Sequence, residues 1–163
     1  MNEQKTRPLK NVDDSETTMT ELVLPNDTNQ LGNLLGGRLM HWLDICAATA
    51  AARHSNHVCV TASVDKIDFH NPVRLGEVVI LKASVNRVFN SSMEVGVKVF
   101  AENTKSGKIT HTNSAYLTFV SVDDTGKPCL SPLVNPTTPE QKRRYEDALI
   151  RRNKRLQQDK IGK

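Results

Sequence analysis

The amino-acid sequence predicts an α+β protein in which a curved antiparallel β-sheet wraps one long central helix. An alanine-rich stretch from Gly37 to about His54 carries apolar residues at helical spacing. After His57 the chain instead alternates apolar and polar residues in long strands joined by short turns, which favours antiparallel pairing. Because one helix and about five strands leave few ways to build a core, we expect the sheet to curl around the helix.

The expected strands follow one another with clear turn signals between them. A first strand is predicted in MTELVLP, which alternates and ends at Pro25. After the helix, four more strands are predicted in VCVTASV continued by KIDF, in GEVVILKASVNRVF, in SSMEVGVKVFAEN and in KITHTNSAYLTFVSV. One helix covers only part of such a sheet, so we expect the remaining edges or faces to self-associate at least into a dimer.

The two ends of the chain differ from its centre. Residues 1–17 are predicted to be a polar mobile tail, residues 18–130 one domain, and residues 131–163 a linker and a basic helix. This helix starts at Thr138-Pro139-Glu140, and the segment from Pro139 to Lys163 contains nine Lys and Arg residues against four Asp and Glu. The basic helix has three interpretations. It is a solvated face, it packs on a neighbouring subunit, or it contacts nucleotide phosphates or an anionic surface.

Composition excludes several classes of protein. The 163 residues have a formal net charge of +4, but the C-terminal segment carries this excess, so no nucleic-acid surface is expected elsewhere. No run approaches the ~20 apolar residues of a membrane span, and the N-terminus has no apolar signal region. The three cysteines lack metal-site or disulfide spacing, which predicts a cytoplasmic protein without a metal.

The window NQLGNLLGGRLMHWLD places Gly36 and Gly37 where the long helix begins. The first N–H groups of a helix have no partner within the helix, and glycine lets a ligand oxygen approach them closely. A phosphate or a carbonyl oxygen could bind there, although no Lys and Ser/Thr follow as in a phosphate-binding loop. An ordinary helix start explains the same glycines and remains the alternative.

Asp44 lies about two turns inside the helix, where aspartate is unfavourable. A carboxylate in this place could activate a water molecule near a carbonyl group bound at the helix start. An exposed position, with Asp44 paired to His41 or Arg38, is the alternative.

Four segments cover roughly residues 18–130 in order: PNDTNQLGNLLGGRLMHWLD, TASVDKIDFHNPVRLGE, NSSMEV and AYLTFVSVDDTGKP. Together they resemble the hotdog-fold acyl-CoA thioesterases, in particular the branch with the bacterial YciA-type and the brain-type cytosolic acyl-CoA hydrolases. The resemblance implies hydrolysis of acyl-CoA without a cofactor. It also implies homodimers with sites at the subunit interface, assembled into trimers of dimers. It further implies that Asp44 is catalytic and that Asn33 acts with it from the facing subunit.

A mechanism follows from these residues. Backbone N–H groups around Gly36, Gly37 or Arg38 are expected to polarise the thioester carbonyl, while Asp44 activates water or attacks directly.

The phosphates of coenzyme A need hydrogen-bond donors and positive charge. The candidates for phosphate binding lie near a predicted hairpin and are Arg87, Asn90, Ser91 and Ser92. An ordinary polar turn explains these four residues equally well. Two alternative functions are a non-hydrolytic protein that senses acyl-CoA or nucleotide, and an enoyl-CoA hydratase, whose histidine motif is not found.

Overall fold

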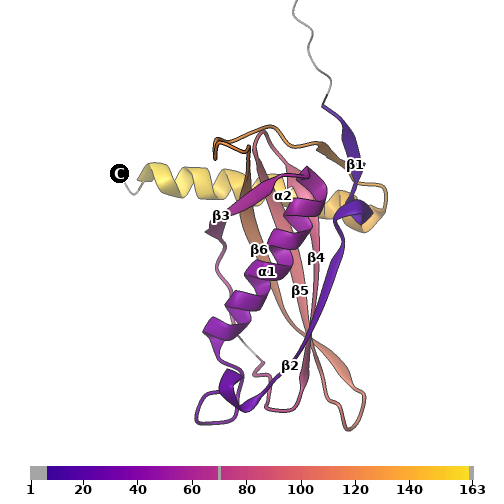
Figure 1. Ribbon diagram of the computed structural model, residues 1–163, viewed down its shortest axis with the longest axis vertical. Coiled ribbons are helices and arrows are strands. Elements are labelled where there is room, and N and C mark those ends of the chain that lie inside the picture. Colours follow the sequence, from indigo (N-terminus) through magenta and orange to yellow (C-terminus); the bar gives the residue numbers. More distant parts are fainter. Residues whose placement is uncertain (1–6, 70, 162–163) are drawn as a thin grey trace, which may run out of the picture.

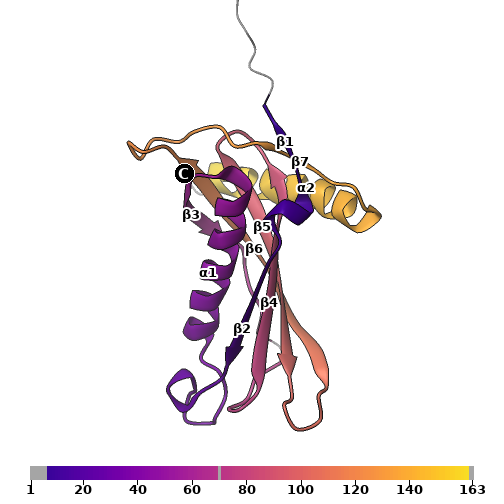
Figure 2. The ribbon, with the colours of Figure 1, turned by 45° about the vertical axis from the view of Figure 1, so that its right-hand side comes forward.

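The computed structural model describes residues 7–69 and 71–161, without the side chains of residues 159–161. A five-stranded antiparallel sheet curls along α1 (Gly36–Ser55), and α2 (Pro139–Ile161) crosses the opposite face of the sheet (Figures 1 and 2). The strands in spatial order are β2 (Thr17–Leu22), β4 (Val78–Val88), β5 (Ser92–Glu102), β6 (Ile109–Val122) and β3 (Val58–Val64). The structure thus confirms the predicted α+β architecture with a central helix and a C-terminal helix.

A small second sheet joins the two ends of the chain. In it, β1 (Leu9–Asn11) pairs in parallel with β7 (Leu133–Asn135), and the short helix η1 (Val12–Ser15) follows β1. The Arg7 guanidinium donates hydrogen bonds to the backbone carbonyl oxygens of Phe89, Asn90 and Ser131. These bonds fix the segment before β1 against the β4–β5 turn.

These contacts bear on the predicted tail and linker. Residues 9–15 of the predicted mobile tail are structured, and the predicted linker contains β7, because each supplies the backbone partner of the other. Residues 1–6 lie outside the described part, and the division into domains stays a prediction. The strand predicted over KIDF was wrong: β3 ends at Val64 and residues 65–69 are irregular.

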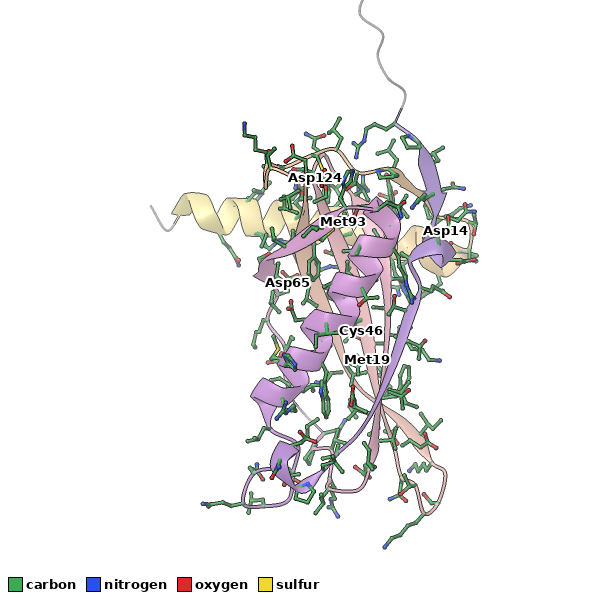
Figure 3. All side chains as sticks on the ribbon, viewed as in Figure 1. Asp14, Met19, Cys46, Asp65, Met93 and Asp124 are labelled. Carbon is green, nitrogen blue, oxygen red and sulfur yellow. The ribbon has the colours of Figure 1, made fainter. Side chains whose placement is uncertain are left out.

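The main core lies between α1 and the concave face of the sheet. The buried face of α1 combines large residues with small ones, Leu39, Leu43, Cys46, Ala47 and Ala50. Alanine and cysteine occupy little volume, so the strands approach the helix closely. Cys46 of α1, Met19 of β2 and Met93 of β5 belong to this core or pack against it (Figure 3). Burial raises the pKa of the Cys46 thiol to about 11, so this thiol stays neutral and takes no nucleophilic role.

Helix α2 is fixed to the convex face of the sheet by arginine contacts. Glu94 of β5 is fully buried, and Arg151 of α2 donates two hydrogen bonds to its carboxylate over 3.0 and 2.7 Å. The Arg151 guanidinium also lies 3.6 Å from the centre of the Tyr116 ring. Arg155 pairs with Asp65, which follows β3 (Figure 3). A buried carboxylate needs such partners, so α2 is an integral layer and not only a solvated helix.

None of the helices in the described residues is long and apolar enough to cross a membrane.

His54, in the last turn of α1, holds the segment before β7. It is fully buried, and its Nε2 lies 2.9 Å from the carbonyl oxygen of Pro132, while no described residue is a partner of its Nδ1. Burial, and to a smaller extent the charge of Lys10, lowers the pKa of His54 below its ordinary value of 6.5, although Pro132 and Asp14 oppose the shift. The neutral ring is therefore the form that the folded protein favours.

This shift predicts a pH dependence of stability. Because the pKa of His54 is lower in the folded than in the unfolded chain, its protonation favours unfolding, and stability falls as the pH drops below about 6.5. A His54→Gln variant keeps a donor for Pro132 but does not titrate, so its free energy of unfolding should depend less on pH between 7 and 5. Urea denaturation across this range measures the difference. Equal slopes for the variant and the wild type would contradict the assignment to His54.

Candidate active site

Asp27 organises the loop that leads into α1. It ends the short helix η2 (Pro25–Asp27), and its carboxylate accepts a hydrogen bond from the N–H of Leu24 over 3.0 Å. The same carboxylate pairs with the Arg38 guanidinium at 2.9 Å, and the carbonyl oxygen of Asp27 accepts the N–H of Leu35. These contacts fix the start of α1. They also engage the Arg38 side chain in an ion pair within the loop.

A tight turn from Asn29 to Asn33 precedes the helix. The Asn29 side-chain oxygen accepts hydrogen bonds from the N–H groups of Leu31 and Asn33, over 2.9 and 3.2 Å. Gly32 has a φ of +74°, a conformation that favours glycine. The N–H of Leu34 donates to the carbonyl oxygen of Val73, so the turn is held against the segment that enters β4. Asn33 therefore has a fixed position beside the helix start.

The first two residues of α1 present their N–H groups outward. The N–H of Arg38 donates to the carbonyl oxygen of Leu35, but no described residue accepts a hydrogen bond from the N–H of Gly36 or Gly37. A Cβ added at Gly37 would meet nothing within 4 Å, and one added at Gly36 would meet only the Phe69 ring at 3.9 Å. Neither glycine has a positive φ among the described residues. Neither backbone conformation nor close packing within the described chain therefore requires glycine at these two positions.

A pocket of about 270 Å³ opens beside these N–H groups. Its wall combines apolar side chains with four asparagines, and the residues are Asn29, Asn33, Leu34, Gly36, Leu39, Phe69, Asn71, Pro72, Val73 and Asn113. Asparagine offers both donors and acceptors, so the pocket suits a ligand with amide or carbonyl groups on an aliphatic chain. Among the predicted site residues, the structure places Asn33 and Gly36 together in this pocket.

Asp44 lies further along α1 on its partly exposed side. Its carboxylate accepts a hydrogen bond of 2.6 Å from the hydroxyl group of Thr61 on β3. The alternative pairing with Arg38 is not observed, because Arg38 pairs with Asp27. Thr61 stands at a β-bulge, where the register with β6 shifts between Thr61 and Ser63. The carboxylate is thus held at the edge of the sheet while remaining open to a ligand.

Asp44 and the start of α1 lie at different levels along the same helix. Gly37 and Asp44 are seven residues apart, which corresponds to a rise of about 10 Å along the helix. The free N–H groups and the carboxylate are therefore two separate places along α1.

The four predicted phosphate-binding residues lie elsewhere. Asn90, Ser91 and Ser92 follow β4, whereas the pocket residue Val73 precedes it, so the eleven residues of β4 separate the two places. Arg87 is engaged by α2, because its guanidinium lies 3.9 Å from the centre of the Tyr145 ring and donates to the carbonyl oxygen of Tyr145. Ser92 lies instead in a separate hollow beside α2.

Sequence reasoning missed Thr61, Asn29 and most residues of the pocket wall. Thr61 opens the matched segment TASVDKIDFHNPVRLGE, and its hydroxyl within a valine-rich edge strand was the available signal. The pocket asparagines Asn71 and Asn113 come from two distant segments, and no pattern in the sequence brings them together. In the described residues, no group of three His, Cys, Asp or Glu side chains is placed to hold a metal ion.

A curled antiparallel sheet around one long central helix is the hotdog fold. The sequence profile of the Thioesterase superfamily matches residues 31–108. The crystal structure of an apo-hexameric acyl-CoA thioesterase superposes with a TM-score of 0.90 at 40% identity, covering 93% of this chain and 97% of that one. The chain therefore belongs to the Thioesterase superfamily.

Two further relatives refine the comparison. Acyl-coenzyme A thioesterase 11 of Mus musculus is 43% identical over 142 residues, which are 87% of this chain but 24% of that protein, so the chain spans about a quarter of its length. An acyl-CoA hydrolase from Staphylococcus aureus, solved with butyryl coenzyme A, coenzyme A and coenzyme A disulfide, has a TM-score of 0.87 at 35% identity, over 95% of this chain and 96% of that one.

Variants of the Staphylococcus aureus enzyme have also been solved, in which one asparagine, one aspartate or one threonine is replaced by alanine. In that chain the asparagine and the aspartate are 15 residues apart, and the threonine follows 17 residues later. Asn29, Asp44 and Thr61 have the same residue types, order and separations here. Asn33 does not have this separation from Asp44.

The surroundings of the glycines predict opposite effects of two alanine substitutions on stability. Gly37→Ala places its Cβ in open space and favours the helix, so the free energy of unfolding should stay equal or rise by up to about 1 kcal/mol. Gly96→Ala places its Cβ 2.7 Å from the Asn86 side chain, which holds Glu94, and should cost about 1–3 kcal/mol. Urea denaturation of both variants compares them directly. A Gly37→Ala variant as destabilised as Gly96→Ala would show that the fold itself requires this glycine.

Proposed function

We propose that this protein is an acyl-CoA thioesterase, which hydrolyses acyl-CoA to a free carboxylic acid and coenzyme A. The observation that carries the proposal is the Asp44 carboxylate, held by Thr61 on the open side of α1 in a chain of this superfamily. The pocket at the helix start adds amide-lined space for a coenzyme A arm. A protein that only senses acyl-CoA has no need of a carboxylate positioned in this way.

The chemistry divides between two chains. The N–H groups of Gly36 and Gly37 in one chain donate to the thioester oxygen and stabilise the negative charge that develops on it. Asp44 of the facing chain activates a water molecule or attacks the carbonyl carbon directly, and coenzyme A leaves as a thiolate. The hydroxyl group of Thr61 orients the carboxylate. No metal or other cofactor takes part in this proposal.

Asn29 is the better candidate for the polar residue that acts with Asp44. Its separation from Asp44 equals that of the asparagine and the aspartate replaced in the Staphylococcus aureus enzyme, and its side chain stands in the pocket wall. Asn33 shares the pocket and receives its orientation from Asn29, so it contributes to the shape of the site.

A second copy of the chain is the proposed partner. The edge strand β3 exposes Val58, Val60 and Val64, and the neighbouring side of α1 exposes Ile45. Apolar side chains on a sheet edge favour pairing with another chain. A dimer formed there brings the open side of α1 toward its partner. One structural relative is hexameric, so we extend the proposal to a trimer of dimers, in the cytoplasm.

Thiol release measures the proposed activity. Asp44→Asn keeps an acceptor for Thr61 but removes the base or nucleophile, so the turnover number should fall at least about 100-fold across a panel of acyl-CoAs of different chain length. Asp124→Asn is the matched control, because this exposed aspartate lies in the turn after β6 and should leave turnover unchanged (Figure 3). Full activity of Asp44→Asn would sink the assignment, and binding of acyl-CoA by the wild type without thiol release would favour the sensor.

Mixed dimers test whether the site is shared. Gly37→Leu blocks the N–H groups of one half-site, and Asp44→Asn removes the carboxylate of the other, so each variant alone should be inactive. Coexpression of the two chains should restore about a quarter of the wild-type turnover, because half of the dimers are mixed and each has one intact site. Mixtures that stay inactive would place both functions in the same chain.

A further inference from the structure

A basic groove lies between the convex face of the sheet and the C-terminal half of α2. It is a hollow of about 330 Å³ whose floor includes the hydroxyl-bearing residues Ser63, Ser92 and Thr118, and whose wall includes Arg152 and Arg155. A second hollow adjoins it along Arg155 and adds Lys66, Arg151 and Lys154. The groove is on the opposite side of the sheet from α1 and is separate from the pocket at the helix start.

The floor presents hydroxyl groups that have no structural use within the described chain. Thr118 of β6 stands directly opposite Ser63 of β3, and Ser92 of β5 stands opposite Val120 of β6, so these residues share one face of three neighbouring strands. The Thr118 hydroxyl group is buried, and no described residue bonds to it. Hydroxyl groups that converge on one hollow can donate to the oxygens of an anion.

Arg152 supplies a charge that the described residues leave without a counter-ion. Its guanidinium lies 4.1 Å from the centre of the Phe89 ring, and no described carboxylate lies within salt-bridge distance. Arg151 and Arg155 beside it are paired with Glu94 and Asp65. Stacking on an aromatic ring fixes the guanidinium plane and leaves its N–H edges available to an anion.

The other basic hollow on this face of the sheet gives a contrast. It measures about 120 Å³ and is lined by Lys82, Lys98, Arg143 and Arg144. The Glu140 carboxylate contacts three of these four cations, at 3.6, 2.9 and 3.0 Å. Its charge is thus largely balanced inside the protein, whereas the basic groove keeps an excess of positive charge.

We propose that the basic groove binds a phosphate monoester through Arg152 and the hydroxyl groups of Ser63 and Ser92. Phosphate offers the planar acceptor edges that a guanidinium group recognises, together with oxygens for the hydroxyl groups. The nucleotide end of coenzyme A and a free nucleotide both present this chemistry. The assignment to coenzyme A rests on the proposed function, since that molecule is then the substrate.

Titration calorimetry with adenosine 3′,5′-bisphosphate tests the site without turnover. Arg152→Gln removes the charge and should weaken binding about tenfold or more, and Ser92→Ala should weaken it less. Arg143→Gln is the matched control, because it makes the same change on the same helix beside the balanced hollow, and it should change affinity less than twofold. Equal effects of Arg152→Gln and Arg143→Gln, in variants with the thermal stability of the wild type, would overturn the proposal.

Steady-state kinetics distinguish the source of the phosphate. If the groove holds the substrate, Arg152→Gln raises the KM for acetyl-CoA, while kcat and the KM for S-acetylpantetheine, which lacks the phosphates, stay unchanged. An unchanged KM together with weaker binding of the bisphosphate supports the phosphate site but assigns it to a separate nucleotide. Wild-type protein that binds the bisphosphate but releases no thiol would contradict the proposed function and leave the groove proposal standing.

Discussion

The close packing of α1 against the concave face of the sheet is the constraint on which the rest of the structure depends. Alanine and cysteine at the contact let the strands approach, and the leucines between them fill the remaining volume. Only one side of the helix is buried in this way. Asp44 lies at the margin of this buried face and stays partly exposed there, because the sheet ends at β3. The same packing that forms the core therefore leaves the proposed catalytic carboxylate uncovered.

The same arrangement separates the free N–H groups from the carboxylate along α1. A helix places its free N–H groups at its first turn, whereas a carboxylate that must contact the edge strand β3 has to lie further along. Thr61 holds Asp44 at that position, about 10 Å from Gly37 along the helix axis. In the proposed dimer, a second chain facing the first brings the two parts together. Exposed valines on β3 make the same edge suitable for pairing.

The sequence predicts the main features of the fold because they rest on local periodicity. Helical spacing in the alanine-rich stretch and alternation in the later strands locate α1 and the five strands of the sheet to within a few residues. The pairing of β1 with β7 escapes prediction, because three-residue strands have no periodicity and each depends on a partner over a hundred residues away. Asp44 is recognisable because its unfavourable position within a helix is a local feature. Its contact with Thr61 joins two separate elements and is therefore not predicted by the sequence.

The β-bulge in β3 connects the two sides of the sheet. In a regular strand Thr61 and Ser63 would point to the same face, but the register shift between them places Thr61 opposite Phe119 and Ser63 opposite Thr118. Thr61 consequently reaches Asp44 on the helix side, while Ser63 faces the basic groove. The buried Glu94 carboxylate fixes α2 through Arg151, and this contact sets the position of Arg152 one residue further along. The bulge in β3 thus places the Asp44 carboxylate and the basic groove on opposite sides of the same strand. The buried ion pair of Glu94 with Arg151 fixes the helix that forms the wall of that groove.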